Sequence, residues 1–160
     1  MGYIHGKSNF IGDVGDTKFI NPFQKNISSN NVSGFLLKWN RSPRHSIKLT
    51  FIKSNLVAND LNSKDPRRIE RGYNFTTPIS EVSAGIEFNM LDFNLHEDYD
   101  IFSPYMYTGL SYSKFDEIML QVDNLISINK KNKTFGIPMI IGLKARFLEK
   151  FIFSIEGGAR

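Results

Sequence analysis

The sequence contains no cysteine, which excludes disulfide bonds, thiolate metal sites and cysteine nucleophiles. Only three histidines are present, His5, His45 and His96. They lie in separate segments without a second ligand at helical or hairpin spacing, so we expect no zinc site. No run of about 18 apolar residues occurs, which excludes a membrane-spanning helix. The same test would miss a membrane β-barrel, because the strands of a barrel alternate between apolar and polar residues.

A basic segment followed by an apolar stretch is also missing from residues 1–10, MGYIHGKSNF, so we expect no signal peptide in them. We therefore expect either that the chain is cytosolic or that its numbering starts inside a mature protein. The formal charge of +4 is a mild excess, and the lysines and arginines are scattered along the chain. Nucleic-acid-binding proteins usually concentrate these residues on one face, so nucleic acid is not an expected partner.

The expected loops contain no complete catalytic or cofactor motif. Residues 12–17, GDVGDT, lack the lysine and the following serine or threonine of a phosphate-binding loop. Residues 60–65, DLNSKD, lack the glycine and the closing glutamate of a calcium loop. Glu81 and Glu87 lie roughly 20 Å apart along one expected strand, too far for joint acid–base catalysis. We therefore expect no enzyme activity, no cofactor, no metal and no small-molecule substrate.

The most regular pattern is the alternation in residues 81–90, EVSAGIEFNM. Every even-numbered residue from Val82 to Met90 is apolar, and no odd-numbered residue between them is a large hydrophobe. A period of two indicates a β-strand with one apolar and one polar face. The fourteen phenylalanines and six tyrosines also favour strands over helices. Six expected strands and a partial seventh lie near residues 2–9, 32–40, 46–52, 75–90, 104–115, 134–147 and 150–160.

The ends of these strands carry further information. Pro138 lacks the amide donor that a ladder needs, so we expect a bulge or a strand end there. Residues 120–128 are the nearest candidate for a helix and could equally extend a hairpin. Bacterial outer-membrane barrels place short turns at one end and long loops at the other. The connections here alternate in the same way: 41–46 and 148–150 are short, 92–103 is intermediate, and 10–31, 53–74 and 116–133 are long.

These patterns predict an all-β fold, a small up-and-down antiparallel transmembrane β-barrel of about eight strands in the bacterial outer membrane. Residues 1–160 would form a single barrel domain. Single-chain bacterial barrels have an even number of strands, and the strand pattern is still running at Arg160. We therefore expect the domain to be incomplete at its C-terminus, with its last strand missing from this chain.

The polar face of the strands would fill the interior of such a barrel. Glycines would make room there, and buried charges of both signs would need to pair. The expected lumen charges are Glu81, Glu87, Lys144, Arg146, Glu156 and Arg160. Aromatic residues gather at the two membrane interfaces of outer-membrane barrels. The candidates for these interfaces are Trp39, Tyr73, Phe75, Phe102 and Tyr105.

The same periodicity also fits a soluble lipocalin-like barrel with its faces reversed. Such a barrel would bind a small hydrophobic ligand in an apolar cavity lined by Val82, Ile86, Phe88 and Met139. Periodicity alone does not separate the two arrangements. Loop alternation, glycine placement and strand lengths near the ~9–11 residues of a tilted spanning strand favour the membrane barrel.

Several stretches resemble one known family. They are GKSNFIGDVG (6–15), KWNRSPRHS (38–46), ANDLNSKDPRRIERGYNF (58–75), ISEVSAGIEFNMLDFN (79–94), FSPYMYTGLS (102–111), GIPMIIGLKAR (136–146) and IEGGAR (155–160). In this order they are similar to the PorG-like outer-membrane proteins of the type IX secretion and gliding-motility machinery of Gram-negative bacteria. The resemblance covers most of the chain and departs from the family at both ends, at the export signal and the last strand.

The resemblance implies a non-enzymatic outer-membrane barrel within a type IX protein secretion apparatus. It also implies two partners, outer-membrane lipid and a periplasmic ring of the PorK/PorN type, built from a lipoprotein and its partner. If the barrel meets this ring from the periplasmic side, the short connections are the candidate contacts. Ordinary solvated turns would account for these residues equally well. The expected partner-binding residues are Arg41, Arg44, His45, Glu149 and Lys150, with residues 92–100 beside them.

Overall fold

The structure is a computed structural model of the chain, and it describes residues 1–15, 30–93, 102–121, 124–147 and 151–160. These ranges contain eight strands and two short helices. In chain order they are β1 (Gly2–Lys7), β2 (Asn31–Asn40), β3 (His45–Asn59), η2 (Asp60–Asn62), α1 (Pro66–Arg71), β4 (Asn74–Asn89), β5 (Phe102–Gln121), β6 (Asn124–Gly136), β7 (Met139–Phe147) and β8 (Phe151–Ala159). Neither helix within these ranges has the length and apolar character needed to cross a membrane.

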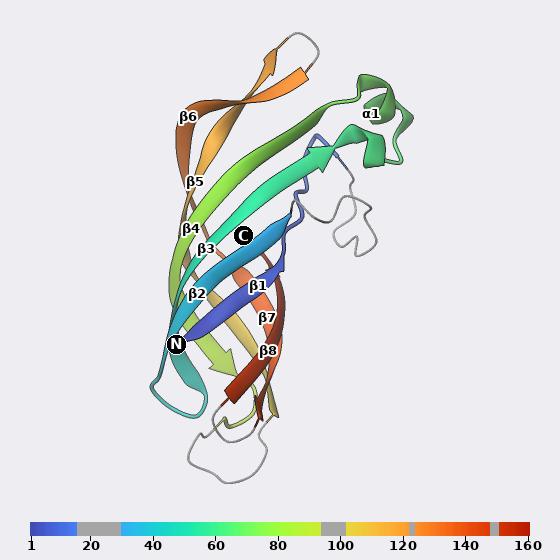
Figure 1. Cartoon of the computed structure of the whole chain (residues 1–160). Helices are drawn as coiled ribbons and strands as arrows, with labels where there is room; N and C mark the ends of the chain where they lie inside the picture. The colour runs from blue at the N-terminus through green and yellow to red at the C-terminus, as the bar shows by residue number, and fades with distance from the viewer. Residues whose placement is uncertain (16–29, 94–101, 122–123, 148–150) are drawn as a thin grey trace.

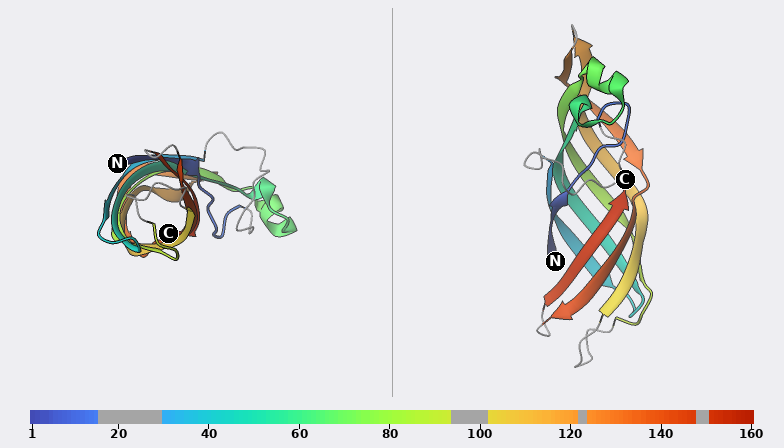
Figure 2. Two further views of the ribbon diagram at one scale, coloured as in Figure 1. Left: turned by 90° about the horizontal axis from the view of Figure 1, so that it is seen from below. Right: turned by 90° about the vertical axis from the view of Figure 1, so that its right-hand side faces the viewer.

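The strands form one antiparallel sheet with up-and-down connections (Figure 1). Its order is β1-β2-β3-β4-β5-β7-β8, and β6 pairs with the far half of β5. Seen along its axis, the sheet curls into a ring that has the C-terminus inside it (Figure 2). Among the described strands, β1 and β8 are the two ends of the sheet, and no ladder joins them. The predicted all-β, up-and-down antiparallel fold is confirmed, in the form of an open barrel.

Strand β5 is long enough to pair with two strands in succession. Its residues Phe102–Thr108 pair with β7, and its residues Ser111–Gln121 pair with β6. Because β6 ends at Gly136 and β7 begins at Met139, the break between them contains Pro138. The strand end expected at this proline is confirmed, since proline has no amide hydrogen to donate to the ladder.

The prediction of a long connection at residues 116–133 is wrong. Strand β5 continues to Gln121 and β6 begins at Asn124, so this region is a hairpin that projects beyond the rest of the sheet (Figure 1). A register shift between Asp116 and Glu117 interrupts the alternation, which is why the sequence pattern stopped short of the true strand end. Long connections remain at 8–30 and 60–73.

The connections define the two ends of the barrel. We call the end that carries residues 41–44, 90–101 and 148–150 the short-turn end. The opposite end, which carries residues 8–30 and 60–73, is the long-connection end. Helix α1 lies at the long-connection end, beside the ring and outside it (Figure 2).

The two faces of the sheet differ in polarity. In β4, Ile86 and Phe88 are 57% and 39% exposed, whereas Glu87 between them is fully buried. Val82 and Met139 are also exposed on the outer face. The lipocalin-like alternative required these four apolar residues to line an interior cavity, and that expectation is wrong. The apolar face points outward, and the charged face points into the ring.

Candidate functional site

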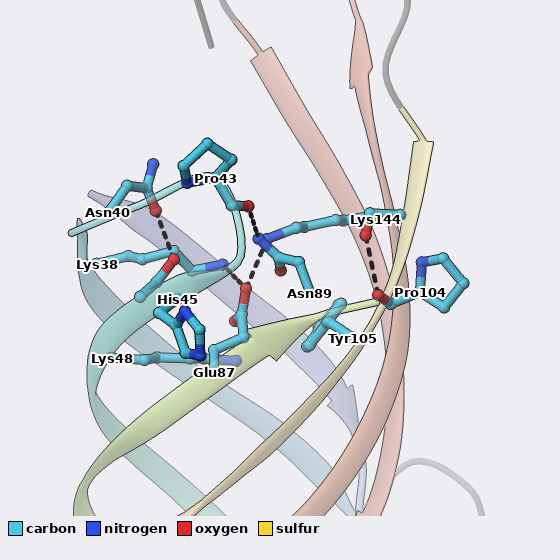
Figure 3. A network of polar contacts seen from close by, with 12 residues as sticks. Lys38, Asn40, Pro43, His45, Lys48, Glu87, Asn89, Pro104, Tyr105 and Lys144 are labelled. Carbon is cyan, nitrogen blue, oxygen red and sulfur yellow. Dashed lines mark hydrogen bonds and ion pairs between the residues drawn. The ribbon is translucent and has the colours of Figure 1, made fainter. Parts of the chain in front are cut away.

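The interior of the barrel contains a cluster of ion pairs centred on Glu87. The alternation of β4 turns this carboxylate inward, where Lys38 of β2 and Lys144 of β7 meet it (Figure 3). The two ammonium nitrogens lie 2.6 and 2.7 Å from the same oxygen, Oε1. A buried carboxylate is stable only when cations or hydrogen-bond donors compensate for its lost hydration. One side chain therefore links three strands of the sheet.

A second cluster surrounds Glu156 of β8. Its Oε2 atom accepts hydrogen bonds from Lys48 Nζ of β3 and from the Tyr105 hydroxyl of β5, both at 2.8 Å. The ammonium groups of Lys38, Lys48 and Lys144 all lie 5.4–5.7 Å from the centre of the Tyr105 ring. Cations at this distance from an aromatic face are attracted by the ring electrons. Tyr105 therefore joins the two ion-pair clusters.

Gly142 on β7 makes room for the Tyr105 ring. A Cβ atom added at this glycine would come within 2.6 Å of Tyr105 Cζ, closer than such atoms approach in folded proteins. The interior position of this glycine, expected from the strand pattern, thus has a direct steric reason. It allows a large aromatic side chain to cross the narrow lumen.

A third cluster lies further along the lumen. Arg160 Nη1 is 2.5 Å from Glu81 Oε1, and the Ser113 hydroxyl donates to the other oxygen of Glu81 at 3.2 Å. Beside them, the Ser83 hydroxyl bonds to the Thr50 hydroxyl and accepts a bond from Tyr107. The hydroxyl contacts connect the neighbouring strands β3, β4 and β5, and the Arg160–Glu81 pair joins the C-terminal residue to β4.

The structure places all six expected lumen charges on the inner face: Glu81, Glu87, Lys144, Arg146, Glu156 and Arg160. The lumen charges expected from the sequence do not include Lys38 and Lys48, which provide cations for Glu87 and Glu156. The sequence contains a signal for both, because an apolar residue stands on either side of each lysine in its strand. Adjacent residues of a strand point to opposite faces of the sheet, so an outward apolar neighbour implies an inward lysine.

At the short-turn end, the start of the β4–β5 connection lies against the β2–β3 turn. Asn89 Nδ2 and the Phe93 amide both donate to the carbonyl oxygen of Pro43, at 2.7 and 3.1 Å. The Phe93 side chain is buried, and Lys144 Nζ lies 4.4 Å from the centre of its ring. An exposed ion pair between Arg44 Nε and Asp92 Oδ1, at 2.5 Å, ties the two connections together. Phe93 therefore covers the Glu87 cluster from this end.

Three of the expected partner-binding residues lie together at this end. Arg41 and Arg44 are exposed in the β2–β3 turn, and His45 begins β3 with its ring 5.2 Å from that of Phe88. Arg44 is held by Asp92, as described above. Glu149 and Lys150 lie outside the described residues.

The expected interface aromatics lie in three different settings. Trp39 and Phe102 are 63% and 52% exposed on the outer face near the short-turn end. Phe75 and Tyr105 are buried on the inner face, so their assignment to a membrane interface is wrong. Both are odd-numbered residues, like the polar inward residues of their own strands, and residues two apart in a strand point to the same face. Tyr73 is half-buried at the long-connection end, where the Arg71 guanidinium lies 4.7 Å from its ring centre.

A continuous row of outward side chains crosses the sheet on the side of the long-connection end. Each member is the register partner of the next, and rings are in contact at two of the steps. We call this set the aromatic row: Tyr3, Phe35, Phe51, Val82, Tyr112 and Phe135. The pattern of a single strand does not predict it, because its members come from six strands and only the register aligns them.

At the long-connection end, Asp60 fastens two connections to each other. Its buried carboxylate accepts bonds from the Gly15 amide at 2.8 Å, Arg71 Nε at 2.9 Å and the Tyr73 amide at 3.2 Å. Arg71 also pairs with Asp13, and Arg68 donates to two carbonyl oxygens of the first connection. Burial opposes ionisation of Asp60, but the hydrogen bonds outweigh it and hold the pKa of this carboxyl below its ordinary value.

Among the described residues, no group of three or more His, Asp or Glu side chains is placed to hold a metal ion. The Asp60 carboxylate, at the start of the segment compared above with a calcium loop, is taken up by Arg71 and by backbone amides.

The family model described as a domain of unknown function, DUF6089, matches residues 1–160. The chain belongs to the DUF6089 family. No curated protein and no solved structure matches it.

The geometry of this DUF6089 chain assigns its buried polar groups a mutual role. Glu81, Glu87 and Glu156 each bond to side chains from at least two other strands or from the C-terminal residue. Such bonds fix the curvature of the sheet, because all of them except the Glu81–Ser113 bond join residues of strands that are not neighbours in the sheet.

Proposed function

We propose that this chain is an outer-membrane β-barrel that serves as a non-enzymatic structural component of a type IX protein secretion apparatus. The observation that carries the proposal is the inverted polarity of the sheet. Large apolar side chains cover its outer face, whereas paired lysines and glutamates fill its interior. In water such an outer face would expose a very large apolar surface. In a bilayer the same face is in contact with lipid.

The length of the apolar outer face supports the same proposal. On β5 the outward residues run from Phe102 through Met106 and Leu110 to Tyr112. At the usual rise per residue this is roughly 33 Å of strand. A strand tilted as in outer-membrane barrels would then cover about 25 Å along the membrane normal, the height of their apolar band.

The proposed partner is a periplasmic ring of the PorK/PorN type. Its support is the resemblance of the chain to PorG-like proteins, together with the general rule that short turns of these barrels face the periplasm. The short-turn end offers Arg41, Arg44 and His45 on a surface that the Arg44–Asp92 pair holds in place. We propose this surface as the contact between barrel and ring.

Single-cysteine variants test both the membrane location and the orientation, because the chain has no cysteine of its own. We choose Ser42→Cys in the short β2–β3 turn and Lys64→Cys in the β3–β4 connection, both exposed. A membrane-impermeant maleimide applied to intact cells should label Lys64→Cys and leave Ser42→Cys unlabelled until the outer membrane is opened. Equal labelling of both variants, or recovery of the chain in a detergent-free soluble fraction, would refute the outer-membrane proposal.

Photocrosslinking tests the partner. A photoreactive residue at Arg41 should capture a ring protein, and the same residue at Lys64 serves as the matched control at the opposite end. Capture from Lys64 alone would overturn the docking side, and capture of no ring protein from either position would overturn the partner.

A further inference from the structure

A row of polar and basic side chains runs alongside the aromatic row, one outward position nearer the long-connection end. Its members are again successive register partners across β1 to β6. None of them is apolar and none is acidic. We call this set the basic row: His5, Ser33, Lys53, Ser80, Lys114 and Lys133.

The lysines of the basic row differ from those inside the barrel. Lys38, Lys48 and Lys144 each pair with a glutamate of the inner face. Of these glutamates, Glu87 is fully buried and Glu156 is partly buried. In contrast, Lys53, Lys114 and Lys133 form no ion pair with any carboxylate in the described part of the chain.

Two of these lysines face each other directly. Lys114 on β5 and Lys133 on β6 are register partners, and both side chains are exposed. Like charges at directly opposite positions of an antiparallel pair destabilise the pairing. An anion placed between the two ammonium groups would remove this repulsion. The arrangement therefore suits an external group with negative charge.

The neighbouring aromatic row indicates where this external group would lie. Tyr112 and Phe135, whose ring centres are 5.3 Å apart, are the outward neighbours of Lys114 and Lys133 on the apolar side. Lys53 likewise lies over Phe51, with its Nζ 5.8 Å from the ring centre. Long basic side chains at the edge of an apolar belt extend their ammonium groups to the level of lipid headgroups.

We propose that Lys53, Lys114 and Lys133 bind phosphate groups of the lipid around the barrel, and that the Lys114–Lys133 pair holds one phosphate between its two ammonium groups. The proposal rests on the proposed membrane location. It adds to that location a specific lipid chemistry, because an uncharged headgroup would leave the repulsion between the two lysines in place.

The test compares Lys114→Gln/Lys133→Gln with the matched control Lys64→Gln/Arg67→Gln. The control also removes two exposed cations, from the β3–β4 connection outside the basic row. The full chain and both variants are folded in detergent micelles and titrated with diphosphorylated lipid A, with lipid A stripped of its phosphates, and with inorganic phosphate. Bound ligand is counted by native mass spectrometry. Insertion of all three proteins into phosphatidylcholine vesicles is measured in parallel by flotation.

We expect the unchanged chain and the control to bind lipid A equally, and the row variant to bind it about 25-fold more weakly, at about fivefold per lysine. Removing the lipid phosphates should produce a similar loss in the unchanged chain. The proposal would be overturned if both variants bound lipid A equally, or if the unchanged chain bound stripped lipid A as strongly as diphosphorylated lipid A. In either case, insertion into the vesicles would show that the barrel itself is still folded. Binding of inorganic phosphate as strong as that of lipid A would also overturn it. Failure of all three proteins to insert would instead refute the membrane location, and this inference with it.

Discussion

The Glu87 carboxylate on β4 and the Lys144 ammonium group on β7 lie 2.7 Å apart, although 57 residues separate them in the sequence. The contact passes over β5 on the inner face, because β5 lies between these two strands in the sheet. Lys38 reaches the same oxygen from β2, on the other side of β4. The two lysines therefore hold Glu87 from strands that only a curved sheet can bring together.

Glu87→Gln should destabilise the folded barrel by about 3–5 kcal/mol, because it leaves Lys38 and Lys144 buried without a full counter-charge. Urea unfolding in detergent micelles, followed by circular dichroism, measures the loss. Asp92→Asn is the matched control, since it removes the carboxylate of the exposed Arg44 pair. Exposed pairs contribute little, so the control should unfold close to the unchanged chain. Similar losses for both variants would contradict the structural role of the Glu87 cluster.

Much of this interior could be predicted from the sequence, since strand parity alone assigns a side chain to one of two faces. Parity placed Glu81, Glu87 and Glu156 correctly inside. It did not show which cation meets which carboxylate, because register and curvature decide which strands face each other. The sequence left residues 120–128 open between a helix and an extended hairpin, because the register shift beside Asp116 interrupts the strand pattern, and the hairpin is the alternative that the structure has.

The errors at Phe75 and Tyr105 have a related cause. Aromatic residues favour strands on either face, so their presence near a strand end does not indicate an interface. Phe75 packs inward against Phe10, with ring centres 5.2 Å apart, and Tyr105 bonds to Glu156 in the lumen. The aromatic row and the basic row are properties of the register, and no single strand contains either of them.

Gly142→Ala tests the steric role of glycine in the lumen. The added methyl group would overlap the Tyr105 ring and should cost about 1–3 kcal/mol. Gly157→Ala on β8 is the matched control, because a Cβ there meets no atom within 4 Å. Tyr105→Leu removes the overlapping ring atoms and leaves only the backbone oxygen of Ile155, 2.8 Å from the added Cβ, so the double variant should lose less stability than the two single losses added together. Strict additivity in urea unfolding would show that the two residues do not interact.

Asp60 gives the long-connection end a dependence on pH. Its pKa in the folded chain is lower than its ordinary value of 3.8, so folding favours the charged form. The stabilisation is therefore complete above about pH 5 and is lost as the pH falls through 3.8 toward the folded pKa. Hydrogen exchange of the peptide covering residues 60–73, followed by mass spectrometry, should show faster exchange of the Tyr73 amide in this window, relative to the intrinsic rate at each pH.

Asp60→Asn provides the comparison for this measurement. The variant should exchange faster than the unchanged chain at neutral pH, and the difference between them should shrink as the pH falls below 3.8, because protonation removes the same charge from Asp60. A difference that stays constant across the whole range would show that the Asp60 charge does not hold this end together.

The direction of the apolar face can be measured through Trp39, the one tryptophan of the chain. This side chain is 63% exposed on the outer face, so brominated acyl chains in phosphatidylcholine vesicles should quench its fluorescence. In a Trp39→Phe background, Ile86→Trp should be quenched as well, because Ile86 is also outward. Tyr107→Trp is the matched inward position on the neighbouring strand, and the buried ring should escape the bromine atoms. Quenching at position 107 with protection at positions 39 and 86 would mean that the sheet presents its charged face to lipid. This result would contradict the structure, in which Glu87 and Glu156 form ion pairs inside the barrel.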